Sequence, residues 1–299
     1  MRPAALTVEV YVAPMRPFHG APAQGPGDEP MWSPMSSTLI AGAEEAILVD
    51  TTITLDQVDA LAEWVRGFGK RVTGVYFTHG HQDHWIGLAR LQQHFPEARG
   101  VATPEVVERA RFEATDPGLS AYWKASFPGE LPPEPVLPEP LEGAELELEG
   151  NVLRAVSVGW GDTEHSTVLH VPSAAAVIGG DVVYNGVHML TAETDEKTRE
   201  AWIASLDAVA ALSPEIVVAG HKRIGALDLP ESIGASQRYL RDFSTVAKQG
   251  GTVEDLVHGM LDLHGERDQP HTLWISARAE VGRRGVNQQD RPDDVCVRT

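Results

Sequence analysis

Three histidines and one aspartate lie within a six-residue stretch of the chain. They belong to the segment Thr78-His79-Gly80-His81-Gln82-Asp83-His84. Imidazole and carboxylate side chains together suit Zn, Fe, Mn or Ni better than a metal selected by thiolates. A single histidine is usually a surface or satisfied core residue, but four ligand-type residues at this spacing rarely coincide by chance. The segment therefore predicts a metal site.

The residues on either side of this segment predict how it is held. Residues 72–77 (VTGVYF) are mostly β-branched and aromatic, which is typical of a buried strand. Residues 85–95 (WIGLARLQQHF) have apolar side chains at helical spacing. A loop between a strand and a helix, with Gly80 at its centre, can direct several side chains at one point.

This segment resembles the T-H-x-H-x-D-H signature of the metallo-β-lactamase superfamily at every fixed position. Three further strand ends carry candidate ligands in the order that the resemblance implies, and it covers about residues 37–225. The resemblance implies two metal ions, expected to be Zn with Fe or Mn as alternatives. It assigns His79, His81 and His165 to the first ion, Asp83, His84 and His221 to the second, and Asp181 as a bridge.

The resemblance also implies a reaction. A hydroxide between two metals would attack an activated carbonyl group, most consistent with a lactone or an ester. Asp181 favours the glyoxalase II-like or lactonase-like branch, because the β-lactamases of the superfamily lack a bridging carboxylate there. Tyr184 matches a substrate-contacting tyrosine of lactonases, although a core aromatic residue is an equal interpretation. We expect Asp83 and Tyr184 to be catalytic and Asp50 to hold a ligand imidazole in place.

Other functions remain open from the sequence. One is a mononuclear iron-dependent dioxygenase of the same superfamily, with iron at the His79, His81 and His165 positions. Others are a thioesterase, a β-lactamase-type hydrolase and a non-enzymatic binding module. Lys222 and Arg223 are candidates for binding a substrate carboxylate, with solvated surface charges as the simpler interpretation.

Periodicity alone indicates an α/β protein, and the resemblance implies a four-layer αβ/βα sandwich. We expect one domain over residues 1–285 with a lid-like insertion near 103–142, and a flexible polar tail at 286–299. A hairpin is expected at 145–159 with its turn at Gly150-Asn151. The long Pro- and Gly-rich loop at 14–36 and the insertion are expected to form the substrate pocket.

The amino-acid composition limits the kinds of partner that the protein is expected to bind. The 299 residues include 43 acidic and 24 basic side chains, and the net charge of −19 argues against nucleic acid and anionic membranes. Cys296 is the single cysteine, which excludes an intramolecular disulfide. No apolar stretch approaches the 18 or so residues of a membrane span, and no signal peptide is recognisable. We therefore expect a cytoplasmic protein with a small-molecule substrate, and a homodimer is compatible with the sequence.

Overall fold

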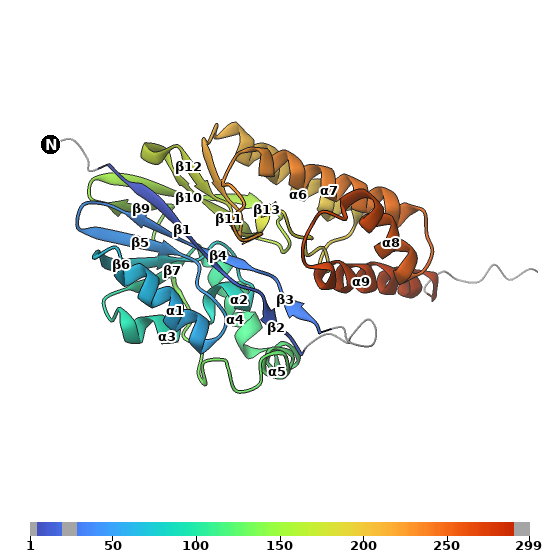
Figure 1. The fold of residues 1–299 in the computed structure, drawn as a ribbon, viewed down its shortest axis with the longest axis horizontal. Helices are drawn as coiled ribbons and strands as arrows, with labels where there is room; N and C mark the ends of the chain where they lie inside the picture. Colours follow the sequence, from blue (N-terminus) through green and yellow to red (C-terminus); the bar gives the residue numbers. More distant parts are fainter. Residues whose placement is uncertain (1–4, 20–28, 290–299) are drawn as a thin grey trace, which may run out of the picture.

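Two β-sheets face each other, with helices covering their outer faces (Figure 1). The computed structural model describes residues 5–19 and 29–289. The first sheet runs in the order β13-β15-β4-β5-β6-β7-β8, with β1 antiparallel to β4, and the second runs β14-β12-β11-β10-β9. The expected four-layer αβ/βα sandwich is confirmed.

The strands and helices have the following bounds. The first sheet contains β1 (Thr7–Ala13), β4 (Met35–Ala41), β5 (Glu45–Val49), β6 (Arg71–Tyr76), β7 (Arg99–Ala102), β8 (Glu139–Pro140), β13 (Tyr184–Asn185) and β15 (His221–Lys222). The second contains β9 (Glu145–Leu148), β10 (Asn151–Gly159), β11 (Ser166–Val171), β12 (Ala176–Ile178) and β14 (Ile216–Val218), and β2 (Arg16–Pro17) pairs with β3 (Met31–Trp32). The helices are α1 (Leu55–Arg66), α2 (Gln82–Trp85), α3 (Leu88–His94), α4 (Pro104–Thr115), α5 (Pro117–Ser126), α6 (Glu196–Ala211), α7 (Glu231–Lys248), α8 (Val253–His264) and α9 (Pro270–Gln289), with 3-10 turns η1 (Pro172–Ala174) and η2 (Gly180–Val182).

Side-chain alternation along β5 shows why the layers form. Ile47 and Val49 lie in the apolar cluster between the sheets, whereas Leu48 between them belongs to the cluster under α1. Successive residues of a strand point to opposite faces, so a strand covered on both faces is apolar throughout. A third cluster packs α6, α7 and α8 on the other sheet, around Trp202 and Phe243. The two sheets are therefore held rigidly, and their loop ends can position a site.

The expected hairpin at 145–159 is present, but its turn lies one residue earlier than expected. Glu149 and Gly150 are the two turn residues, with φ angles of 48° and 78°. This conformation disfavours a glutamate. The carboxylate of Glu149 compensates by accepting hydrogen bonds from the backbone N–H groups of Ala43, Glu44 and Glu45. The sequence favoured Gly150-Asn151 as the turn, because the contact between Glu149 and residues 43–45 cannot be recognised from the local sequence.

The expected helix at 85–95 is divided into α2 and α3. Gly87 lies between them, and a Cβ there would come within 2.5 Å of the Thr52 carbonyl oxygen. The chain therefore passes close to residues 51–52 at this point, where a larger residue than glycine would clash. Asp83 and His84 lie on the short helix α2 rather than in the loop before a helix.

The insertion and the C-terminal region are more helical than the sequence indicated. Residues 104–126 form α4 and α5, and α9 continues to Gln289, beyond the expected domain boundary at 285. Part of the 14–36 loop, residues 20–28, lies outside the described residues, as do residues 290–299 with Cys296.

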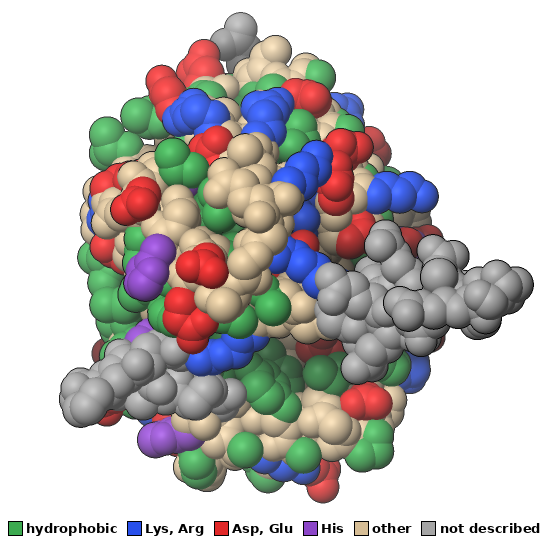
Figure 2. Space-filling model, turned by 90° about the vertical axis from the view of Figure 1, so that its right-hand side faces the viewer, with side chains coloured by type: hydrophobic (Ala, Val, Ile, Leu, Met, Phe, Trp, Pro, Cys, Tyr) green, Lys and Arg blue, Asp and Glu red, His purple; other side chains and the backbone are tan. Residues whose placement is uncertain are grey.

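The surface carries charges of both signs. On the face seen in Figure 2, basic and acidic side chains are interspersed, without a continuous basic stripe. Among residues 5–19 and 29–289, none of the helices combines the length and the apolarity that crossing a bilayer would need.

Candidate metal centre

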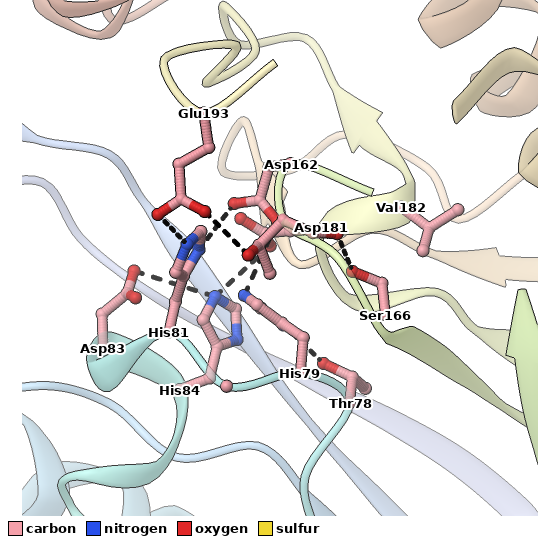
Figure 3. A network of polar contacts seen from close by, with 12 residues as sticks. Thr78, His79, His81, Asp83, His84, Asp162, Ser166, Asp181, Val182 and Glu193 are labelled. Carbon is pink, nitrogen blue, oxygen red and sulfur yellow. Dashed lines mark hydrogen bonds and ion pairs between the residues drawn. The ribbon is translucent and has the colours of Figure 1, made fainter. Parts of the chain in front are cut away.

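Six of the seven predicted ligands lie together, and Figure 3 shows His79, His81, Asp83, His84 and Asp181 among them. His79 and His81 follow β6, and Asp83 and His84 lie on α2. Asp181 lies in η2, directly after β12, and His221 begins β15. All six are at least 93% buried. Strand ends far apart in the sequence therefore supply one compact cluster, as the sequence predicted.

The potential ligand atoms form overlapping groups in which all lie within 4.8 Å of one another. One group is His79, His81 and Asp162; a second is Asp83, His84 and His221. Asp181 joins the two groups, because it forms a further group with His79 and His84. Its Oδ1 is 3.3 Å from His84 Nε2, and its Oδ2 is 3.3 Å from His221 Nε2. The cluster therefore consists of overlapping donor groups that could hold a metal ion, with Asp181 near members of both.

His165 does not join the cluster, and this prediction is corrected. It has a φ of 62° just before β11, and its side chain is 53% exposed and lines a separate shallow groove. Asp162, in the same turn, takes the place expected for His165, with Oδ2 2.8 Å from His81 Nδ1 and Oδ1 3.9 Å from His79 Nε2. The Gly161 N–H donates to the Thr163 carbonyl, which turns Asp162 inward. Asp162 is a ligand-type residue three positions before His165, so the sequence contained a signal for it.

Close backbone packing positions the carboxylate of Asp181. A Cβ added to Gly220 would lie 2.0 Å from Asp181 Oδ1. Gly180 has a φ of 48°, and a Cβ there would meet Thr78 Oγ1 at 2.3 Å. Glycine is thus required at both positions for the strand ends to converge.

Hydrogen bonds on the outer side of the cluster fix two imidazole orientations. His84 Nδ1 lies 3.1 Å from Asp50 Oδ2, and His221 Nδ1 lies 3.1 Å from the Pro34 carbonyl oxygen. Because a carboxylate and a carbonyl only accept hydrogen bonds, both Nδ1 atoms carry the proton. The Nε2 atoms are then free to bind a metal. Asp50 also accepts bonds from the Thr78 N–H and hydroxyl, so its predicted supporting contact is present.

The donor set fits divalent metal ions. Buried atoms that point into the cluster lack a hydrogen-bond partner, namely His79 Nε2, His84 Nε2, Asp162 Oδ1 and Asp181 Oδ1. Unpaired buried polar atoms are costly and therefore rare, so their convergence indicates a ligand. Burial, and then the charge of neighbouring imidazoles, lowers the pKa of His79. Burial opposes ionisation of Asp181, but His221 and His84 outweigh it and lower the pKa of that carboxyl group. Burial raises the pKa of Asp162 to about 7. Burial of His221 opposes its charging, but Asp181 outweighs it and raises the pKa of that imidazole to about 10. A bound cation would therefore displace protons from these groups.

A cavity of about 210 Å³ opens onto this cluster. His81, Asp83, Asp162, Asp181, Glu193 and His221 lie at its polar end. Its other walls are mainly apolar and come from β3, from α5, from the segment before α6 and from α9. The residues are Trp32, Leu119, Tyr122, Trp123, Leu190, Ala192, Thr272 and Ile275. The loop at 14–36 and the insertion thus contribute as predicted, while the contribution of α9 was not foreseen.

Tyr184 lines this cavity and donates a hydrogen bond of 2.6 Å from its hydroxyl to Asp181 Oδ2. Burial, and then Asp181, raises the pKa of Tyr184 well above its usual range. Lys222 and Arg223, in contrast, do not line the cavity. Lys222 pairs with Asp228 and Arg223 with Asp268, so the structure does not support their role in binding a substrate carboxylate.

Comparison with known proteins gives the family. The family model of the metallo-beta-lactamase superfamily matches residues 31–221. Similar solved structures include a metallo-beta-lactamase from Pontibacter korlensis, with 17% identity, coverage of 79% of this chain and 99% of that chain, and a TM-score of 0.58. FIM-1 from Pseudomonas aeruginosa, solved in a mono-zinc form, has 20% identity, coverage of 81% and 97%, and a TM-score of 0.57. A metallo-beta-lactamase family protein from Thermus thermophilus has 20% identity, coverage of 93% and 94%, and a TM-score of 0.58. The chain belongs to the metallo-beta-lactamase superfamily.

Proposed function

We propose that this protein is a dinuclear metal-dependent hydrolase that acts on an uncharged carbonyl compound, a lactone or an ester with an apolar substituent. The observation that carries the proposal is the cavity beside the metal cluster. Its described lining residues include no lysine or arginine, and Glu113 and Glu193 make its polar end acidic. A substrate with a free carboxylate, such as a β-lactam, would find no lysine or arginine side chain among these lining residues to pair with it. The apolar walls favour a neutral substrate instead.

The residues of the chain have distinct parts in the proposed reaction. Bound divalent ions would supply Lewis acidity, polarising the carbonyl oxygen and lowering the pKa of water. Asp83 lies 3.4 Å from His221 Nε2 and lines the cavity, so its carboxylate would orient an attacking water at the second site. Tyr184 remains protonated because of its raised pKa, so it would donate its hydroxyl proton toward the leaving oxygen. The aromatic walls would exclude bulk water from the reacting group.

The test is a substrate panel with metal-loaded protein. Neutral lactones and esters with apolar substituents should turn over fastest, thioesters should follow, and β-lactams should be slowest. Activity should disappear on chelation and in His84→Ala. Two bound metals without hydrolysis of any panel member would refute the proposal. A strong preference for anionic β-lactams would refute the substrate class alone.

A second candidate function is an iron-dependent oxygenase. His79, His81 and Asp162 form a set of two histidines and one carboxylate, which is the donor set of many non-haem iron oxygenases. Oxygen uptake by iron-loaded protein with a thiol or persulfide substrate, and none by zinc-loaded protein, would favour this function over hydrolysis.

A further inference from the structure

The first metal site differs from the site that the family resemblance implies. An aspartate, Asp162, stands with His79 and His81 where a third histidine was expected. Asp162 is 99% buried, and its Oδ1 has no hydrogen-bond partner. His79 Nε2, which faces it, also lacks a partner. These two buried atoms point to a bound cation between them.

We propose that this first site favours a harder divalent ion, such as Mn²⁺ or Fe²⁺, over Zn²⁺ relative to a site with three histidines. Carboxylate oxygen suits Mn²⁺, whereas imidazole nitrogen adds more to the affinity for Zn²⁺. Replacing one nitrogen donor by an oxygen donor therefore lowers the selectivity for Zn²⁺. The inference deepens the proposed function and rests on it for the presence of two ions.

The surroundings of His81 also favour a harder ion over Zn²⁺. Its Nε2 lies 3.2 Å from Glu193 Oε1, on the side of the ring away from Asp162 (Figure 3). Glu193 is fixed in turn by Arg109, at 2.6 Å, and by the hydroxyl of Thr163, at 2.8 Å. A carboxylate that accepts the Nε2 proton makes Nδ1 a more electron-rich donor. The first site is therefore enriched in negative charge through both direct and indirect contacts.

Asp162 also changes the formal charge of the proposed metal centre. The family resemblance implied two carboxylates against two divalent ions. The structure provides three, Asp83, Asp162 and Asp181, which leaves a formal charge of +1 before any hydroxide is bound. A less positive centre holds its ions by charge more than by covalent character, which again favours hard cations.

The experiment compares Asp162→His, Asp162→Asn and the wild type in metal competition. Each protein is stripped with chelator and dialysed against equal buffered activities of Mn²⁺ and Zn²⁺, and the bound metals are counted by mass spectrometry. Mn²⁺ bound to the protein is also followed by electron paramagnetic resonance. Asp59→Asn, at a surface ion pair away from the centre, serves as the control for loss of a carboxylate. Hydrolysis is measured on the same samples.

We expect the bound Zn²⁺ to Mn²⁺ ratio to rise about tenfold in Asp162→His relative to wild type and Asp59→Asn. Circular dichroism shows whether Asp162→His is folded. If Asp162→His is unfolded, Asp162→Asn provides the test. Asparagine preserves the shape of the side chain, and this variant should lose Mn²⁺ affinity more than Zn²⁺ affinity. Equal ratios in folded Asp162→His and wild type, or unchanged Mn²⁺ affinity in Asp162→Asn, would overturn the inference. A shifted ratio with no hydrolysis would refute the proposed function and leave the inference standing.

Discussion

Asp50 offers a sharp test of how the proposed second metal site is held. It lies at the end of β5 with a φ of 57° and is 98% buried. Asparagine tolerates this backbone conformation, so Asp50→Asn changes the hydrogen bonding and leaves the chain path intact. In the wild type Oδ1 accepts the Thr78 N–H at 2.9 Å. Oδ2 accepts the Thr78 hydroxyl at 2.8 Å and His84 Nδ1–H at 3.1 Å.

Neither orientation of the new amide satisfies these partners. If the NH₂ group of Asn replaces Oδ1, it faces the Thr78 N–H, and a buried donor is left unpaired at a cost of about 1–3 kcal/mol. If it replaces Oδ2, it faces His84 Nδ1, which must then give up its proton. His84 would carry that proton on Nε2, the atom that faces the metal. We therefore expect the affinity of the second site to fall about 10- to 100-fold, which corresponds to about 1.4–2.8 kcal/mol.

The assay is a chelator-competition titration that resolves two binding steps, with urea unfolding of the metal-stripped protein alongside. One step should weaken in Asp50→Asn and the other should remain near its wild-type value. Asp59→Asn, a surface carboxylate-to-amide change, should leave both steps unchanged. Wild-type affinity at both sites in folded Asp50→Asn would refute the reasoning.

Three further substitutions probe other parts of the protein. Tyr184→Phe should lower kcat about tenfold or more while the metal content by mass spectrometry stays the same, and an unchanged kcat would exclude its role as a proton donor. Ile275→Ala should change KM for bulky apolar esters more than for small ones in steady-state kinetics, and equal effects would argue against α9 as a pocket wall. Hydrogen bonds from Arg90, and then from His94, lower the pKa of Asp59 to about 2. Because this folded-state pKa is depressed, the stabilisation is present above the usual pKa near 4 and is lost as the pH falls towards 2. Urea unfolding should therefore show Asp59→Asn less stable at pH 7 by under about 1 kcal/mol, with the difference shrinking below pH 4; a pH-independent difference would contradict this assignment.

The parts of the fold that the sequence predicted well are those with strong local patterns. Residues 72–77 were expected as a strand, and β6 occupies almost the same position. Helix α1 has an equally clear local pattern, because its apolar side chains at Val58, Leu61 and Val65 share one face and are buried against the sheet. Where a distant contact decides the conformation, as at Glu149, the local pattern was misleading.

The candidate site, too, was predictable where its residues are close in sequence and unpredictable where distant segments meet. The H-x-H-x-D-H segment is contiguous, so its spacing alone marked four cluster residues. His165 and Asp162 are both ligand types within one turn, and only the three-dimensional path of that turn determines which of them faces the cluster. Glu193, near His81, is 112 positions away in the sequence from that histidine. A contact that depends on the packing of two separate loops leaves no mark in sequence spacing.

The cavity shows that specificity and chemistry are built from different parts of this chain. The family model ends at residue 221, yet Thr272 and Ile275 of α9 line the cavity. The segment before α6 is tied to α9 through the hydrogen bond from the Thr191 N–H to the Ser276 hydroxyl. Just before α9, the Gln269 amide donates to the Met31 carbonyl in strand β3, which also carries Trp32. Because α9 contacts two other cavity walls and supplies none of the predicted ligands, changes in it can reshape the pocket while the ligand residues stay the same. Substrate choice can therefore vary in this chain while the metal chemistry of the superfamily is preserved.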